Sequence, residues 1–193
     1  MWKAIFWLKE KSNLKMVITL TIVFFIFLGL MNGNVIGTAK LNSITGGAGI
    51  LDANFGYSPD KAYSVLENQG TEGRQFYTNM LYFDFVFPFV YMMFGVITIG
   101  FLLKLCHIKT RRLNLLLLAP VLAAICDWTE NIFILLMIGK FPAKLALTAH
   151  LASTFTVMKI IFIAVFLAAV IVLLLCAIHS SLMGRRTKVK HSS

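Results

Sequence analysis

The sequence predicts an all-α fold: a polytopic integral membrane protein with four transmembrane helices and a partly helical outer loop. Three observations predict it. Hydrophobic residues make up 59% of the 193 residues and charged residues only 13%, whereas soluble domains carry roughly 25% charged residues. The apolar residues form four long runs. The basic residues, which give a net charge of +10, cluster between these runs, so we expect membrane lipids as partners and no nucleic acid.

Each apolar run is long enough to cross a membrane as a helix, which takes about 20 residues. In a single membrane domain (1–193), the runs cover about residues 14–33, 80–105, 113–139 and 149–179, and the outer loop is 34–79. None shows the two-residue alternation of a transmembrane strand. Trp2, Phe6 and Trp7 before the first run are typical of an anchor at the membrane interface. A signal peptide cleaved after Ala39 is the alternative.

The outer loop is too long to be a simple connector. Ser58 and Pro59 indicate a helix start, with Ser58 as the N-cap and Pro59 at the first helical position. Gly70 can end this helix. Thr71 can then begin another helix that continues into the second transmembrane run. The glycines of segment 45–49 indicate a flexible turn, or a shallow re-entrant dip by Ile50, Leu51 and Phe55. A phosphate-binding loop is the weaker interpretation, because the segment lacks the lysine and the Ser or Thr of such a loop.

The distribution of basic residues predicts the orientation. Twelve of the 18 Lys and Arg residues lie at the N-terminus, at the C-terminus and between the second and third runs. In a four-helix topology these three segments share one side of the membrane, and the positive-inside rule makes that side cytoplasmic. We therefore expect a multi-pass protein of the plasma membrane with both termini in the cytoplasm.

Ionisable side chains within the predicted helices indicate a candidate site. Each costs about 2.5 to 3.5 kcal/mol at a helix centre, so each requires a partner or a function. Asp127, Glu130 and Asn131 share one face of the third helix because they are spaced i, i+3 and i+4. The candidate catalytic residues are Asp127, Glu130 and Lys159, and the candidate substrate-binding residues are Arg74, Tyr77, Asp84, Tyr91, Asn131 and Thr156.

The three carboxyl groups of this set outnumber its one lysine. Arg74 can descend to pair with Asp84, or one acid can stay protonated because burial disfavours its charge. A divalent cation is the third option. It ranks last because Lys159 competes for the same oxygens, so we expect no metal and no other cofactor. The alternative to a functional site is an ion-pair network that only fixes helix register.

Two function classes stay open, and the sequence does not decide whether the protein is an enzyme. The first is a pocket in the outer half of the bundle that binds or modifies a lipid-like substrate. Asp127 or Glu130 would be the general acid or base, and Lys159 and Arg74 would hold an anionic group.

The second class is proton- or ion-coupled transport. Four helices are few for a transporter, which favours a homodimer, and Gly95 and Gly100 are small residues that suit such a contact. The structural alternative is an accessory membrane protein whose outer loop binds a partner.

Four short motifs carry a family resemblance. They are the segment 51–59 (LDANFGYSP), Gly73-Arg74, Asp84 with Pro88 and Tyr91, and the segment 127–131 (DWTEN). With these motifs the chain resembles a type of small bacterial four-helix integral membrane protein that has no assigned activity. The resemblance implies the fold over most of the chain and no chemistry.

Overall fold

The computed structural model describes residues 2–108 and 110–190, and all regular elements in this part are helices. They are α1 (Trp2–Lys11), α2 (Leu14–Asn32), α3 (Thr38–Thr45), α4 (Pro59–Asn68), α5 (Gly70–Asp84), α6 (Phe87–Leu105), the 3₁₀ helix η1 (Arg111–Leu117), α7 (Leu118–Lys140) and α8 (Ala146–Lys190). Four stretches are long and apolar enough to cross a membrane: Leu14–Asn32, Gly70–Leu105, Arg112–Lys140 and Ala146–Ser180. The prediction of an all-α fold with four such stretches is confirmed.

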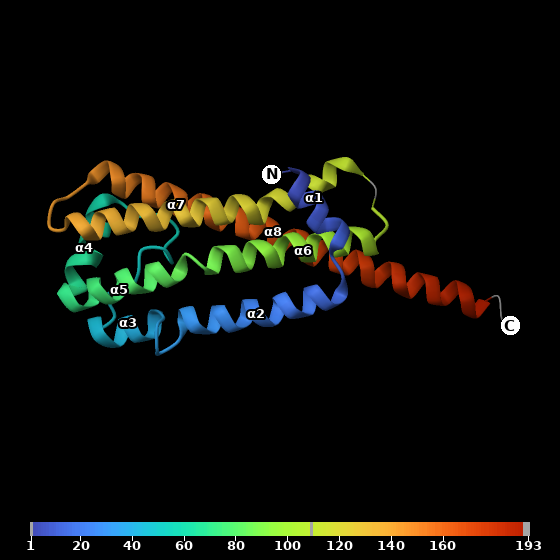
Figure 1. Cartoon of the computed structure of the whole chain (residues 1–193), viewed down its shortest axis with the longest axis horizontal. Coiled ribbons are helices and arrows are strands. Elements are labelled where there is room, and N and C mark those ends of the chain that lie inside the picture. The colour runs from blue at the N-terminus through green and yellow to red at the C-terminus, as the bar shows by residue number, and fades with distance from the viewer. Residues whose placement is uncertain (1, 109, 191–193) are drawn as a thin grey trace.

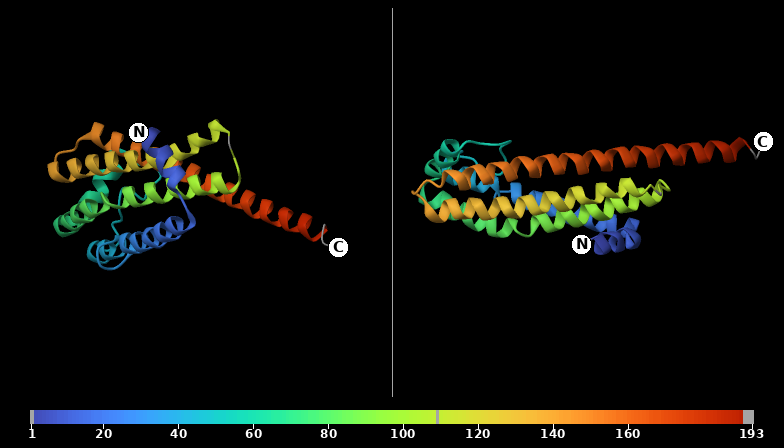
Figure 2. Two further views of the ribbon diagram at one scale, coloured as in Figure 1. Left: turned by 45° about the vertical axis from the view of Figure 1, so that its right-hand side comes forward. Right: turned by 90° about the horizontal axis from the view of Figure 1, so that it is seen from above.

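The long helices lie side by side along the molecule (Figure 1). Helices α6, α7 and α8 pack against one another, and α2 packs mainly against α6. The short helices α3 and α4 and the connection from α7 to α8 lie at one end. Helix α1, the connection from α6 to η1 and the C-terminal part of α8 lie toward the other, where α8 extends beyond the bundle (Figures 1 and 2). The three basic segments therefore lie toward the same end of the molecule.

The second apolar run differs from its prediction. The chain is helical from Gly70, close to the helix predicted to begin at Thr71 and to continue into this run, but it is interrupted between Asp84 and Phe87. Pro88 explains the interruption, because it has no N–H to donate to the carbonyl of Asp84. The indole Nε1 of Trp128 donates a hydrogen bond to the carbonyl of Phe85, 2.9 Å away. A side chain from α7 thus satisfies a backbone group at the break.

The outer loop is partly helical, and its helix start at Pro59 is confirmed. The hydroxyl of Ser58 accepts a hydrogen bond from the backbone N–H of Lys61. Helix α5 begins at Gly70 and not after Thr71. The sequence did not predict α3, which ends at Gly46 in the left-handed region at a φ of 64°. Such a φ favours glycine.

Many large apolar side chains lie on the surface of the bundle, while several polar and ionisable residues are buried within a mainly apolar core. In the most apolar 18-residue stretch of α2, only 6% of the residues are buried. The corresponding share in α8 is 22%. The exposed side chains include Ile18, Ile22, Phe25 and Ile26 on α2 and Ile161, Val165, Ile171 and Val172 on α8. The buried polar residues include Asp84, Asp127, Glu130, Asn131, Thr156 and Lys159. Ionisable residues inside and apolar residues outside are typical of a membrane bundle.

Gly95 and Gly100 are used for packing within the chain. A Cβ on Gly95 would lie 2.6 Å from the Cβ of Pro120 on α7, and a Cβ on Gly100 would lie 3.0 Å from the Cα of Lys9 on α1. Both glycines are buried. They allow α7 and α1 to approach α6 closely, so they are not an outer surface for the dimer contact that the sequence suggested.

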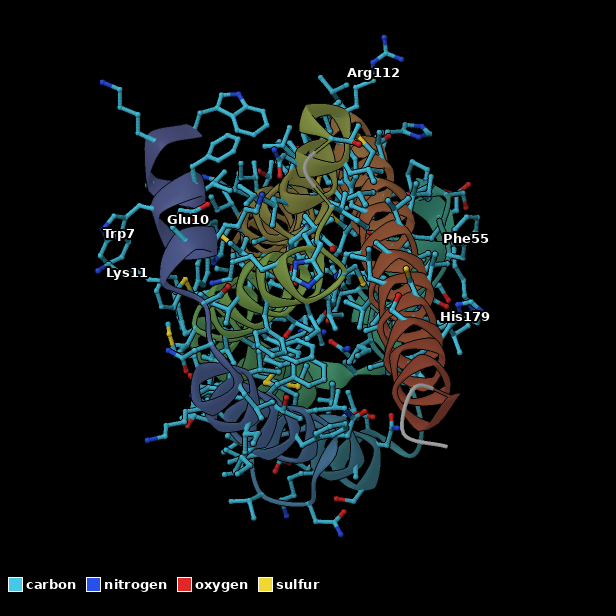
Figure 3. The ribbon with its side chains drawn as sticks, turned by 90° about the vertical axis from the view of Figure 1, so that its right-hand side faces the viewer. Trp7, Glu10, Lys11, Phe55, Arg112 and His179 are labelled. Atoms are coloured by element: carbon cyan, nitrogen blue, oxygen red, sulfur yellow. The ribbon has the colours of Figure 1, made fainter. Side chains whose placement is uncertain are left out.

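Helix α1 lies across α6 toward the basic end of the molecule. The ammonium of Lys104 on α6 donates hydrogen bonds to the carbonyls of Glu10 and Ser12, at 3.0 and 2.6 Å. Trp7 and Lys11 point outward from this helix (Figure 3). An attached helix with outward aromatic and basic side chains fits the predicted interfacial anchor.

Candidate functional site

The three candidate catalytic residues form one buried cluster. The ammonium Nζ of Lys159 on α8 lies 2.6 Å from Glu130 Oε2 and 3.2 Å from Asp127 Oδ1, both on α7. Asp127 and Lys159 are nearly buried, and Glu130 is fully so. The spacing of three residues between Asp127 and Glu130 places both carboxyl groups on the face of α7 that meets α8. The sequence predicted this convergence, and the structure shows it.

Hydroxyl groups engage the remaining oxygens of the two carboxyl groups. Tyr91 donates a hydrogen bond to Asp127 Oδ2 at 3.0 Å, and Thr156 donates one to Glu130 Oε1 at 2.6 Å. With Lys159 on the other oxygen of each group, all four oxygens have a close polar or charged partner. Buried charges are tolerated when they are paired and hydrogen-bonded in this way.

Asp84 and Asn131 form a second, separate pair. The amide Nδ2 of Asn131 donates a hydrogen bond to Asp84 Oδ2 at 2.8 Å. Both residues are buried. Both salt bridges in the described part of the chain are made by Lys159 with other acids, so Asp84 has no cationic partner there.

Arg74 does not reach the cluster, so the expectation that it pairs with Asp84 is wrong. Its guanidinium donates a hydrogen bond to the carbonyl of Leu66 at 2.8 Å and lies 4.1 Å from the ring centroid of Phe141. Leu66 belongs to α4, and its carbonyl faces α5 near the end of the bundle. The arginine is held by these neighbours and does not descend along α5.

Asp52 belongs to the site, although the sequence analysis treated it as an outer-loop residue. Its carboxyl Oδ1 accepts a hydrogen bond from Tyr77 at 2.6 Å, and its carbonyl accepts one from Lys159 at 3.4 Å. The same Tyr77 hydroxyl accepts from the backbone N–H of Leu51, which is fully buried. Tyr77 therefore ties the loop to α5. The apolar residues beside Asp52 were the only sequence signal that this loop turns inward.

The loop that carries Asp52 is also attached to α8 and to the junction between α4 and α5. The backbone N–H of Tyr57 donates to the hydroxyl of Ser153 at 2.8 Å, and Gln69 donates to the carbonyl of Gly49 at 2.9 Å. Burial raises the pKa of the Tyr57 phenol above its usual range. The two hydrogen bonds hold the loop against α8 and the residue before α5.

A cavity of about 370 Å³ adjoins the cluster. Its polar wall contains Asp52, Asp84, Tyr91, Asp127 and Lys159. Its apolar wall includes Phe24, Leu28 and Met31 of α2 and Ile160, Ile163 and Phe166 of α8. These two helices each pack against α6, and the cavity lies between them. Ligand sites commonly have this size and this combination of apolar walls with a few polar groups.

The donor set does not resemble a metal site. Within residues 2–108 and 110–190, no three His, Cys, Asp or Glu side chains come together in a way that could hold a metal ion. Lys159 occupies the space between Asp127 and Glu130, where a cation would otherwise bind. The buried acids and Lys159 can therefore bind polar groups of a ligand through hydrogen bonds and charge.

The chain matches no protein-family model, no curated protein and no solved structure. Its function has to be inferred from its own residues.

Proposed function

We propose that the protein is a multi-pass membrane protein whose cavity binds a lipid-like amphiphile. The polar head would lie against Asp84, Asp127 and Lys159, and the apolar part would lie between α2 and α8. The observation that carries this proposal is the cavity itself, which has ionisable groups on one wall and aliphatic and aromatic side chains from two helices on another. This division matches the two parts of an amphiphile.

A membrane location is supported by the exposed apolar surfaces of α2 and α8. Large apolar surfaces on a folded chain require lipid or a protein partner to cover them. The long apolar stretches are of membrane-spanning length, and the basic segments lie toward one end of the molecule. We propose that this end is cytoplasmic.

Reporter fusions test this topology. A reporter at the C-terminus and one in the connection 106–110 should both be read as cytoplasmic, and one inserted at Gly47 should be read as external. The expectation follows from the 12 basic residues in the three segments of one end. An external C-terminus would contradict the proposed orientation.

The existing contacts of the Asp127 and Glu130 carboxyl groups favour ligand binding over acid–base catalysis. All four oxygens of Asp127 and Glu130 are already engaged by Lys159, Tyr91 and Thr156. A general base needs an oxygen within hydrogen-bond reach of the substrate proton. In this structure the cluster is instead a fixed polar wall. Asp84 and Asp52 are the cavity acids with fewer partners, because each carboxyl group accepts one hydrogen bond from the described residues.

Filling the cavity should reduce lipid binding. Ile163→Trp places a larger side chain on the apolar wall. Native mass spectrometry of protein purified in a mild detergent should then show several-fold less retained lipid than in the parent. Ile171→Trp is the matched control, because Ile171 is an exposed residue of the same helix and is not part of the cavity wall.

Two results decide the proposal. Lipid retained by the parent and by Ile171→Trp, but lost from Ile163→Trp, supports it. Equal retention by all three proteins, each with the same thermal unfolding temperature, would show that the lipid is bound elsewhere and that the cavity is not its site.

A further inference from the structure

We infer that the ligand of this cavity carries a positively charged ammonium head and that Asp84 is the residue that binds it. The inference rests on the proposed function and specifies the class of amphiphile. Four observations support it: the excess of carboxyl groups, the environment of Asp84, the aromatic rings beside it and the engagement of the nearby cations.

The first observation is the charge of the polar wall. Asp52, Asp84 and Asp127 line the cavity. Among the described lining residues the ammonium is that of Lys159, which is shared between Asp127 and Glu130, an acid outside the lining. Four carboxyl groups and one ammonium in a poorly solvated region favour a cationic guest, because opposite charges attract more strongly where the dielectric is low.

The second observation is the environment of Asp84. Its exposed fraction is only 5%, yet it lines the cavity. Asn131 holds Oδ2, whereas Oδ1 receives no hydrogen bond from the residues that the structure describes. Oδ1 is not among the fully buried side-chain atoms that lack a partner, so a group in the cavity that Asp84 lines can reach it. An ammonium in the cavity would supply the missing partner.

The third observation is the aromatic character of the wall next to Asp84. Phe24, Phe87 and Tyr91 all line the cavity. The Phe87 ring contacts both of the others, with its centroid 5.8 Å from that of Phe24 and 5.6 Å from that of Tyr91. Aromatic faces attract cations, and ammonium ligands are commonly bound by such rings together with an acid.

The fourth observation is the engagement of Lys159 and Arg74, which disfavours an anionic head group. The two cations that the sequence analysis assigned to an anionic group are both engaged elsewhere. Lys159 pairs with two carboxyl groups, and Arg74 contacts Leu66 and Phe141. An anion in the cavity would therefore meet acids without a free cation.

A series of amphiphiles with one tail and different heads tests the inference. The parent protein in lipid nanodiscs is titrated with dodecylammonium, dodecylphosphocholine, dodecanol and dodecanoate, and the dissociation constants are measured by competition with a fluorescent amphiphile. The cationic member should bind about tenfold or more tightly than the neutral one, because hydrogen bonds and contacts to a buried charge are worth at least that factor. Dodecanoate should bind most weakly.

Asp84→Asn provides the matched test of the residue. It keeps the shape of the side chain and removes its charge, so the preference for the cation should fall about tenfold, toward that of the neutral member. Asp60→Asn is the control, because Asp60 is an exposed acid on α4, and it should retain the preference. The head-group series on the unaltered protein tests the inference even if Asp84→Asn does not fold.

The outcomes separate the two proposals. If all four heads bind the parent equally and Ile163→Trp abolishes their binding, the cavity binds amphiphiles but this inference is wrong. If the cation is preferred equally by the parent and by folded Asp84→Asn, Asp84 is not its binding residue. If Ile163→Trp leaves the binding of every member unchanged, the proposed function fails as well.

Discussion

Replacing Lys159 with leucine is expected to lower the free energy of unfolding by about 3 to 5 kcal/mol, the usual cost of removing one partner from a buried ion pair. The reason is that Lys159 pairs with both Asp127 and Glu130. Its loss leaves two buried carboxyl groups without a cation. The measurement is thermal unfolding in detergent, and a large decrease in the unfolding temperature relative to the parent is expected.

Removing the acids together with the lysine should restore stability in steps. Lys159→Leu with Glu130→Leu should be more stable than Lys159→Leu alone, because one unpaired carboxyl group is removed. Asp127 would remain without a cation but would keep its hydrogen bond from Tyr91. Adding Asp127→Asn should recover more. If all these variants unfold at the temperature of the parent, the charges are not coupled and the proposed cluster is wrong.

Gly95→Ala is the second change expected to have a large effect. The added methyl group would lie 2.6 Å from the Cβ and 3.0 Å from the Cγ of Pro120, and 3.4 Å from the ring of Phe166. The proline ring cannot rotate away, so α6 and α7 must separate. Overpacking of this kind costs about 1 to 3 kcal/mol, which should appear as a lower unfolding temperature in the same assay.

The control for this prediction is Gly29→Ala. Gly29 lies in α2, and a Cβ there would have no neighbouring atom within 4 Å. Alanine is a better helix former than glycine by up to about 1 kcal/mol, so Gly29→Ala should be neutral or stabilising. If both alanine variants behave alike, the close approach of α6 and α7 at Gly95 is not as the structure shows.

The fold could be predicted because its signals are local. A membrane-spanning helix is defined by the length and composition of one continuous run, and the helix start at Pro59 by its own cap, Ser58. Pro88 indicates a kink in the second run, because a proline inside a helix leaves a backbone carbonyl without its N–H partner. The sequence does not show that an indole from another helix, Trp128, donates to the carbonyl of Phe85 at this break.

The candidate site was predicted where helix periodicity determines the geometry. The spacing of Asp127, Glu130 and Asn131 gives one face of α7 without knowledge of the rest of the fold. Arg74 was misplaced and Asp52 was missed for a common reason. Their positions depend on how α4 and the loop before it pack against the bundle, and this is set by tertiary contacts such as the one between Asp52 and Tyr77.

The way in which α2 is attached has a consequence for how a ligand enters and leaves. The helix is joined to its neighbours through stacked rings, including Phe24 on Phe94 of α6 and Phe27 on Phe83 of α5. Lys159 is held from α7 and from the loop of Asp52, and α2 contributes to neither. In the proposed membrane location, displacing α2 sideways would open the cavity toward lipid, while the contacts of Lys159 with Asp127, Glu130 and Asp52 stayed in place. Ligand exchange would thus be limited by the separation of aromatic rings, not by the breaking of buried ion pairs.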